Sequence, residues 1–527
     1  MAQVNYIDAK TDAVGETIEG VVCVVGAGAA GLTLVRRLAK TVSGVVLIES
    51  GEFEIDDATQ SLYSSRMRGL PYFDLATSRL RYFGGTTNHW AGYCRAIDAI
   101  DYEARPSAGL PGWPVAQADV EPFATEAARD LGINGDFFEP VALLDGAAMD
   151  SAGLAEHSSE LLKTKVYQIA KEGVIRLGPR YRDEIGASQN VRVYLNLNAA
   201  HVQLAADGGS VDHLRCATLT GKQVVVRARF FVLCCHAIEN ARLLLTSHDV
   251  ATRGIGNQFD HVGRYFMDHT GVTASKFIPS DAFPKFYDFE VGKTRSINAV
   301  LGFADTTLRK YDLLQYTCRF EPVYAEPETA GAIERVRRGL NKPGDASFLR
   351  DVATVLADLP VVPSYVAARY NLYFAKPLYY SIEHHLEQAP NPSSRVVISN
   401  RRDALGNLIA DLDWQMAEAD YRSFAVGQDL LGAEMAALGW GRMVPEAITP
   451  EFVREQVFGF WHNIGTTRMS ATPESGVVDS NCRVHGIANL YVGGSSVFPS
   501  AGGGAPTMMI MALALRMSDH LKHQLES

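Results

Sequence analysis

The stretch that decides the fold is "VVCVVGAGAAGLTLVRRLAK", residues 21–40. Val21 to Val25 form an unbroken apolar run of mostly β-branched residues, which predicts a buried parallel strand. Gly26, Gly28 and Gly31 follow at once and lead into a segment with apolar residues at helical spacing. A strand, a glycine-rich turn and a helix in this order predict a dinucleotide-binding unit, because the turn lets backbone N–H groups approach a pyrophosphate at the helix N-terminus.

A second apolar run, Val45–Ile48, follows that helix and ends in Glu49. An acid after the second strand can accept hydrogen bonds from the hydroxyls of a ribose. The same carboxylate disfavours NADP, whose 2′-phosphate it would repel. The motif by itself does not separate NAD from FAD.

The composition is that of an ordinary soluble globular protein, with 527 residues, 47% hydrophobic and 21% charged. This length predicts two domains sharing a large core. The net charge of −11 argues against nucleic acid or an anionic membrane as the main partner. The sequence shows no secretion signal and no apolar run long enough to span a membrane, so we expect a cytoplasmic protein.

The cysteines and histidines give no metal-type spacing. Seven scattered cysteines predict reduced, mostly buried thiols. His384 and His385 are adjacent, but alternation along a strand sends the two side chains to opposite faces. We therefore expect no metal site.

Four segments together resemble the glucose–methanol–choline (GMC) family of FAD-dependent oxidoreductases. They are the N-terminal glycine motif, "RYFGGTTNHWAG" (81–92), "ARFFVLCCHAIENARLLLTS" (228–247) and the C-terminal pair "FWHNIGTTRMS" (460–470) and "GIANLYVGGSSVFPSAGGGAPTMMIMALALRMSDHL" (486–521). The bacterial branch near pyranose oxidases and sugar dehydrogenases looks nearest. The resemblance runs from about residue 21 to 520 and is loosest at about 279–375.

The resemblance implies an α/β fold with a Rossmann-like FAD-binding domain and an α+β second domain built on an antiparallel sheet. The FAD-binding domain then comprises 18–275 and 456–527, and the substrate domain is mainly 276–455. The segments 298–305, 313–320 and 379–388 alternate like strands of such a sheet. The segment of about 328–370 predicts a helical insertion, which is either plain packing or a lid or assembly surface.

The resemblance also implies a set of FAD contacts, which are Gly26, Gly28, Gly31, Glu49, Gly84, Gly85, Asn88, His89, Trp90, Val202, Gly494, Ala505, Pro506 and Thr507. Pro506 predicts the first turn of a helix whose N-terminus can face the pyrimidine end of a flavin. His89 matches the histidine that covalent-flavin members attach to the flavin 8α-methyl group. The alternative is a histidine that only packs at the edge of the ring.

His462 is the candidate catalytic base, since the histidine of an "H-x-x-G-T" motif faces the flavin N5 in the family. The family usually places a second His or Asn where this chain has Ala505. Asn463 looks like a poor substitute, because neighbours on an extended segment point to opposite sides. Either another group completes the site, such as His269 or a tyrosine of the sheet, or one base suffices.

Three further residues in the matching segments have plain explanations. His236 stands where the family usually has glycine, and a tolerated substitution without chemistry is the simpler interpretation. Glu239 and Asn240 suit the N-terminus of a helix. Arg468 either stabilises negative charge near the flavin or forms an exposed ion pair.

The expected activity is oxidation of a CH–OH group by hydride transfer to flavin N5, with oxygen, a quinone or a carrier protein as the electron acceptor. Because of Ala505, the alternatives are flavin-dependent decarboxylation, elimination or C–C dehydrogenation. A flavin-binding protein without turnover is a third hypothesis. The substrate is expected to be small, neutral, and aromatic or sugar-like, and an oligomer is compatible with the sequence. The aromatic residues considered for its pocket are Tyr311, Tyr316, Phe320, Tyr370, Tyr373 and Phe374.

Overall fold

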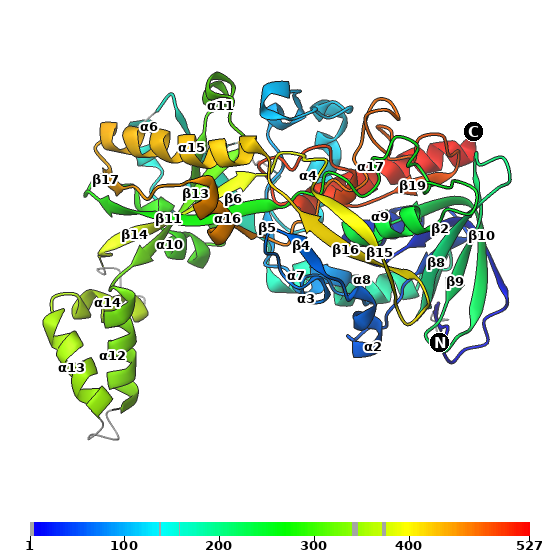
Figure 1. Cartoon of the computed structure of the whole chain (residues 1–527), viewed down its shortest axis with the longest axis horizontal. Helices are drawn as coiled ribbons and strands as arrows, with labels where there is room; N and C mark the ends of the chain where they lie inside the picture. Colours follow the sequence, from blue (N-terminus) through cyan, green and yellow to red (C-terminus); the bar gives the residue numbers. More distant parts are fainter. Residues whose placement is uncertain (1–4, 136–138, 157–158, 340–345, 371–375) are drawn as a thin grey trace.

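The computed structural model describes residues 5–135, 139–156, 159–339, 346–370 and 376–527. Its two large sheets lie in different halves of the elongated body shown in Figure 1. The first sheet lies near both termini, and the second lies in the other half, from which a group of three helices extends.

The first sheet has the order β1-β7-β3-β2-β10-β9-β8, with β19 beside β10. The strands from β1 through β10 and on to β19 are parallel, and β9 and β8 are antiparallel additions. The bounds are β1 (Tyr6–Asp8), β2 (Thr17–Val25), β3 (Val45–Ile48), β7 (Val191–Leu195), β8 (Asn198–Leu204), β9 (Val211–Ala217), β10 (Gln223–Leu233) and β19 (Leu490–Val492). This confirms the Rossmann-like half of the expected fold.

Helices connect and cover this sheet. They include α1 (Ala29–Leu38), α4 (Glu121–Asp130), α8 (Leu177–Gly186), α9 (His236–Thr246) and α17 (Pro506–Glu526). The C-terminal helix α17 packs against α1 and α4, which joins the C-terminal segment to the N-terminal unit. Apolar runs such as Val22–Val25 are fully buried because they lie between these helix layers.

The second sheet has the order β17-β11-β14-β13-β12-β6-β5, with β18 beside β11, and each pairing is antiparallel. The bounds are β5 (Tyr93–Cys94), β6 (Leu162–Ile169), β11 (His269–Pro279), β12 (Ile297–Phe303), β13 (Tyr316–Val323), β14 (Tyr379–Glu387), β17 (Gly441–Val444) and β18 (Phe458–Gly459). The three segments expected to be strands are β12, β13 and β14. Helix α15 (Glu418–Ala437) packs against this sheet.

The chain crosses between the two halves more often than a division at 275 and 455 suggests. β5 and β6 belong to the first 275 residues but form the edge of the second sheet. A third, small sheet joins β15 (Arg395–Arg402) and β16 (Leu408–Trp414) to β4 (Met67–Gly69). Pairing across the sequence therefore ties the halves together, and sequence order alone does not mark a clean boundary.

The expected helical insertion consists of α12 (Pro327–Gly339), α13 (Ala346–Ala357) and α14 (Val362–Arg369). These helices extend away from the second sheet at the lower left of Figure 1. Within the described ranges, no single helix is long and apolar enough to cross a membrane. Phe348–Ala357 and Val362–Arg369 reach the required length and composition only as a pair, which is bent by 104°.

The remaining helices are short and lie in the connections. The α-helices are α2 (Asp57–Gln60), α3 (Leu75–Ser78), α5 (Pro140–Gly146), α6 (Ala152–Glu156), α7 (Glu172–Ile175), α10 (Phe289–Thr294), α11 (Asp305–Tyr311) and α16 (Pro450–Gln456). A 3-10 turn, η2 (Gly85–Asn88), forms the centre of the "GGTTNHW" segment.

Candidate active site

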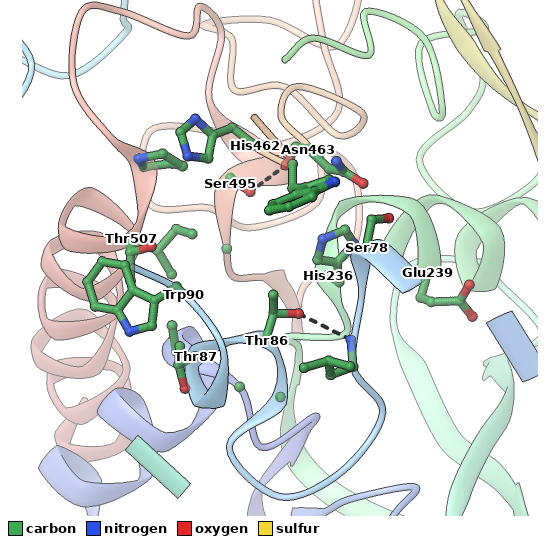
Figure 2. A pocket seen from close by; sticks show the side chains of 18 of the residues that line it. Ser78, Thr86, Thr87, Trp90, His236, Glu239, His462, Asn463, Ser495 and Thr507 are labelled. Carbon is green, nitrogen blue, oxygen red and sulfur yellow. Dashed lines mark hydrogen bonds between the residues drawn. The ribbon is translucent and has the colours of Figure 1, made fainter. Parts of the chain in front are cut away.

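A cavity of about 900 Å³ runs from the glycine turn after β2 to the face of the second sheet. It lies at the carboxyl ends of the parallel strands, where open α/β sheets bind ligands. Figure 2 shows part of its wall, with His236 and Glu239 on one side, Trp90 and Thr507 on another, and His462 near Asn463 and Ser495.

The three glycines of the N-terminal motif have different structural roles. Gly26 has φ +98°, and a Cβ there would lie 2.5 Å from the carbonyl oxygen of Cys234. A Cβ on Gly31 would lie 1.9 Å from the oxygen of Gly26, so this glycine allows α1 to pack on the turn. A Cβ on Gly28 would meet no atom within 4 Å and would project into open space. Gly26 and Gly28 line the cavity, and Gly31 supports the turn from behind.

Glu49 lies at the end of β3 and is 5% exposed. Its Oε2 accepts a hydrogen bond from the Ala27 backbone N–H at 2.8 Å, and its Oε1 accepts one from the Gly51 N–H at 2.9 Å. These bonds fix the carboxylate at the cavity wall. Oε1 also accepts the Ser50 hydroxyl at 3.2 Å, whereas Oε2 has one partner among the described residues and can accept a second hydrogen bond, from a ligand hydroxyl.

The "GGTTNHW" segment contributes one wall. Gly85, His89 and Trp90 line the cavity, and Nε2 of His89 lies 2.9 Å from the Tyr82 hydroxyl. Asn88 instead holds the local turn, since its amide donates to the Phe83 carbonyl and its oxygen accepts from the Gly178 N–H. A Cβ on Gly84 would collide with Asn88, so Gly84 is needed for the turn.

At the other end of the cavity, two histidines meet. Nδ1 of His462 lies 2.9 Å from Nδ1 of His269, and Nε2 of His269 lies 2.8 Å from the Gly502 carbonyl oxygen. Both rings line the cavity. Burial lowers the pKa of His269 to about 4 and, together with His269, holds the pKa of His462 well below its usual range. Both imidazoles are therefore neutral at pH 7.

Asp268 lies next to this pair and is fully buried. Its Oδ1 accepts the backbone N–H of His462 at 2.9 Å, and its Oδ2 accepts the hydroxyl of Tyr72. Burial raises the pKa of Asp268 to about 6. Ligand-type atoms of Asp268, His269 and His462 lie within 4.8 Å of one another. The hydrogen bonds above already occupy the paired nitrogens and both carboxylate oxygens, and the expectation of no metal stays a prediction.

The loop before α17 closes this end of the cavity. The Gly502 N–H donates to Glu387 at 2.8 Å and the Gly503 N–H to Asp101 at 3.0 Å, while the Tyr167 hydroxyl donates to the Gly503 carbonyl at 2.7 Å. Ala505 is the N-cap residue of α17 and carries no side-chain cap. Ala505, Pro506 and Thr507 line the cavity, together with Gly494 after β19.

Comparisons with known proteins agree with this architecture. Residues 390–514 match the family model described as GMC oxidoreductase. The 6‴-hydroxyparomomycin C oxidase of Streptomyces lividus is 25% identical and covers 94% of this chain and 90% of its own. The 2-methyl-1,2-propanediol dehydrogenase of Mycolicibacterium austroafricanum is 21% identical and covers 95% of both chains.

The fold has solved counterparts over nearly its whole length. Formate oxidase aligns with a TM-score of 0.57 and 15% identity over 97% of this chain and 100% of its own. Pyridoxine 4-oxidase from Mesorbium loti aligns with a TM-score of 0.56 and 19% identity over 96% and 99% of the two chains. Residues 390–514 therefore carry the GMC oxidoreductase family match, and the chain as a whole is similar to GMC-type oxidases and dehydrogenases. The family match and these relatives make it an oxidoreductase, and FAD is its cofactor.

The residues that line the cavity fit FAD on their own features. Gly28 offers open space beside the N-terminus of α1, and Glu49 offers carboxylate oxygens for a ribose. Nδ1 of His236, Nε of Arg81 and Oδ1 of Asn463 are buried polar atoms with no hydrogen-bond partner among the described residues. All three residues line the cavity, so a bound dinucleotide can supply polar partners along its length.

The structure brings most of the expected site residues to one cavity and leaves four outside its wall. The expected residues on the wall are Gly26, Gly28, Glu49, Gly85, His89, Trp90, His462, Gly494, Ala505, Pro506 and Thr507. Gly31, Gly84 and Asn88 shape the turns behind it. Val202 on β8 is fully buried away from the cavity, and its N–H donates to the Ser247 hydroxyl at 2.9 Å.

Asn463 differs from its expectation. Both His462 and Asn463 line the cavity, and the Asn463 amide donates to the Tyr72 hydroxyl at 2.9 Å. Strict alternation does not apply here because β18 ends at Gly459 and Trp461 has a left-handed backbone with φ +62°. The two histidines on β14 do alternate: His384 is buried against Tyr316, and His385 lines the cavity.

The aromatic residues expected to form the pocket do not line it where the structure describes them. Tyr316 and Phe320 are buried in the core, Tyr311 and Tyr370 do not line the cavity, and Tyr373 and Phe374 fall outside the described residues. The aromatic side chains that do line it are Tyr63, Phe73, Tyr82, Trp90, Tyr93, Tyr167, Phe458, Phe460 and Trp461. Tyr93 and Tyr167 enter through β5 and β6, whose pairing with the second sheet has no local sequence signal.

A buried charge cluster near the nucleotide end was also missed. Glu239 on α9 pairs with Arg79 at 3.1 Å, Arg81 at 3.4 Å and Arg242 at 3.2 Å. Burial opposes ionisation, but the three guanidinium groups outweigh it and lower the pKa of Glu239 to about 2. Arg468 is not in this wall: it packs over the ring of Tyr265 at 3.6 Å.

His236 occupies a position that favours glycine. Its φ is +74°, a left-handed conformation that costs a residue with a Cβ of order 1 kcal/mol. The side chain lines the cavity, and burial together with Arg79 lowers its pKa to about 3, so the ring is neutral. This backbone geometry is the kind that favours the glycine expected at this position from the family resemblance.

Proposed function

We propose that this enzyme oxidises a CH–OH group of a small, neutral, hydroxyl-bearing substrate, with His462 as the base that accepts the hydroxyl proton. The observation that carries the proposal is the neutral His462 at the cavity end, within hydrogen-bond distance of a second histidine. Bound FAD supplies the acceptor for the hydride that leaves the carbon.

His462 suits the role of base because its imidazole is uncharged over the physiological range. Burial lowers its pKa, so the lone pair needed to accept a proton is present at neutral and mildly acidic pH. Removing the hydroxyl proton raises the electron density at the carbon and lowers the barrier to hydride departure. The cost of the low pKa is a weaker base, which the cavity offsets by holding the substrate close to the ring.

The wall opposite the C-terminal loop favours a substrate with several polar groups. Thr317 and Arg319 on β13 and His385 on β14 line the cavity side by side, since β13 and β14 are paired. Arg319 lies 3.5 Å from Glu383, which balances its charge. The mixture of donors, acceptors and aromatic side chains such as Phe460 supports a sugar-like or other neutral hydroxylated molecule.

The names of relatives support the same substrate class. They include paromamine 6′-oxidase of Streptomyces fradiae and the fructose dehydrogenase large subunit of Gluconobacter japonicus, which are 24% and 26% identical. The latter alignment covers 57% of this chain and 48% of that protein. These names do not decide between oxygen, a quinone and a carrier protein as acceptor. Cytoplasmic localisation also stays a prediction.

Decarboxylation, elimination and C–C dehydrogenation are disfavoured by one observation. The sequence motivates them because Ala505 cannot replace the usual second polar residue. In the structure His269 offers a polar ring beside His462. A polar partner for the base is therefore available from another element.

The test is anaerobic reduction of the purified yellow protein by a panel of sugars, amino sugars, polyols and aromatic alcohols. A substrate is expected to bleach the visible flavin band and to yield a carbonyl product. His462→Ala is expected to lower the rate of flavin reduction by about 10²–10⁴-fold at unchanged flavin content. His213→Ala, a change at a surface histidine paired with Asp212, serves as the matched control and keeps the full rate.

Two results would contradict the proposal: reduction of His462→Ala at the wild-type rate, or turnover of an acid with loss of carbon dioxide in place of a hydroxyl substrate. Mixing the reduced protein with aerated buffer then identifies the acceptor class. Reoxidation within a turnover time favours an oxidase, and persistence of the reduced spectrum favours a quinone or a carrier.

A further inference from the structure

The ring of His462 is held by another ring and not by a carboxylate. The planes of His269 and His462 are nearly perpendicular, at 86°, with their centroids 5.0 Å apart. The Nδ1 atoms face one another at 2.9 Å, which is a hydrogen-bond distance. Asp268 binds the backbone N–H of His462, so it fixes the main chain and leaves the ring to His269.

The partners of His269 determine where the protons lie. A peptide carbonyl only accepts, so the 2.8 Å contact with the Gly502 oxygen requires the proton of His269 on Nε2. A neutral imidazole carries one such proton, and Nδ1 of His269 is then an acceptor. The facing Nδ1 of His462 must donate, which leaves the lone pair of neutral His462 on Nε2.

This polarity suits a base that acts from Nε2. Among the described residues, Nε2 of His462 has no hydrogen-bond partner, and the ring lines the cavity. The other tautomer of His462 would place two lone pairs 2.9 Å apart, an arrangement that repels. The series of hydrogen bonds from the Gly502 carbonyl through His269 to His462 therefore specifies one tautomer and one ring orientation of His462.

We propose that His269 is a positioning residue that holds His462 in the tautomer with its lone pair on Nε2, in place of the polar side chain missing at Ala505. This inference rests on the proposed role of His462 as base. When the substrate O–H bond breaks, the proton forms the Nε2–H bond of His462. The Nδ1 proton stays in place and donates to His269, whose own Nε2 proton stays on the Gly502 carbonyl.

Other charged and titratable groups around the pair do not supply this function. Asp268 accepts from Tyr72 and from backbone. Glu387, opposite His269 on β14, accepts the Gly502 N–H, and His385 pairs with Glu383. Arg319 lies at the cavity wall beside Glu383 and disfavours a proton on His462 through its charge.

Two variants of His269, to Asn and to Leu, distinguish a role in positioning His462 from a role in packing alone. In His269→Asn the amide oxygen can take the place of Nδ1 as acceptor for the His462 proton, whereas His269→Leu fills similar space with no acceptor. The Gly502 loop keeps its bonds to Glu387, Asp101 and Tyr167 in both variants. Flavin content and the thermal midpoint of each variant serve as the check on folding.

Flavin reduction under anaerobic stopped-flow conditions gives the readout across a pH series. His269→Leu is expected to lower the limiting rate by about 10²–10³-fold, within the range of acid–base effects, with KM changed by less than roughly threefold. Its rate should keep rising with pH, because hydroxide replaces the misoriented base. The limiting rate of His269→Asn should stay within about tenfold of the wild-type rate. It should also level off at high pH, as the wild-type rate does.

The proposal is overturned if folded, flavin-loaded His269→Leu retains the wild-type rate and plateau, or if Asn and Leu lower the rate equally with parallel pH profiles. Failure of the underlying function is a separate result, seen when His462→Ala itself keeps the wild-type rate. If His462→Ala is slow and His269→Leu is not, only the role of His269 fails.

Discussion

Glu239 gives the sharpest quantitative prediction, because one buried carboxylate faces three guanidinium groups at the wall of the FAD cavity. Its oxygens lie 3.1 to 3.4 Å from Arg79, Arg81 and Arg242. The Arg79 side chain is 2% exposed, so water does little to screen the charges. We expect Glu239→Gln to leave Arg79 and Arg81 without a carboxylate partner among the described residues.

The magnitude follows from the pKa of Glu239, which the arginines lower from 4.5 to about 2 against the effect of burial. A difference of about 2.5 pKa units corresponds to about 3 kcal/mol of the free energy of unfolding. Removing one partner of a buried ion pair typically costs about 3–5 kcal/mol, which is the same order. Glu239→Gln should therefore lose about 3 kcal/mol of unfolding free energy at pH 7.

The sign of the pH dependence is fixed by the lowered pKa in the folded state. The stabilisation is fully present above the unfolded pKa of 4.5 and is lost as the pH falls through about 2. At pH 3.5 about 1.4 kcal/mol of it is already gone in the wild type, because the unfolded carboxyl binds a proton that the folded one does not. Glu239→Gln lacks this contribution, so its deficit shrinks as the pH falls.

Urea unfolding followed by tryptophan fluorescence at pH 7 and at pH 3.5 measures both effects. Glu103→Gln is the matched control, since Glu103 also pairs with an arginine, Arg309, but both side chains are 46% exposed. Exposed pairs contribute at most about 1 kcal/mol. Equal destabilisation by the two variants, or a Glu239→Gln deficit that does not change between the two pH values, would refute the reasoning.

Two further predictions concern the cofactor. Gly28→Val is expected to fold but to bind no FAD, because its side chain enters the open space beside α1. Gly31→Val should not fold, since its Cβ would lie 1.9 Å from the Gly26 oxygen. Soluble yield and flavin absorbance check both variants, and a flavin-loaded Gly28→Val would contradict the placement of the dinucleotide. If His89 is joined to the flavin, acid-precipitated wild type retains the yellow colour in the pellet and His89→Ala releases it; colour in the wild-type supernatant would mean that His89 is only a cavity contact.

The dinucleotide half could be predicted from sequence because its signals are local. The run before Gly26, the acid at Glu49 and the strand at Leu490–Val492 all lie in the structure as expected. Each of these depends on neighbours within one strand–turn–helix unit. Three strands of the second sheet, β12, β13 and β14, could be predicted as well, since alternation along a strand is a local property too.

The substrate end could not be predicted in detail because it depends on pairings between distant segments. His269 and His462 are separated by 193 positions. Tyr167 reaches the cavity only because β6 joins the edge of the second sheet, and the sequence of β6 does not specify its neighbour. The family resemblance implies an FAD contact at Val202, whereas in the structure its N–H donates to the Ser247 hydroxyl and the residue lies away from the cavity.

The contact between the two histidines follows from a mismatch in strand length. Met267 pairs with Ile464, and Thr270 pairs with Gly459, so two residues on one side face four on the other, Phe460 to Asn463. The extra residues bulge, with Trp461 in the left-handed region, and such bulges re-aim side chains beside active sites. A shift of one residue in this pairing would move a ring by about 3.3 Å, more than a hydrogen bond of 2.9 Å tolerates. The register of β11 against β18 therefore sets the His–His distance, and the reacting end of the site depends on how the two halves of the chain are joined as well as on the residues each half supplies.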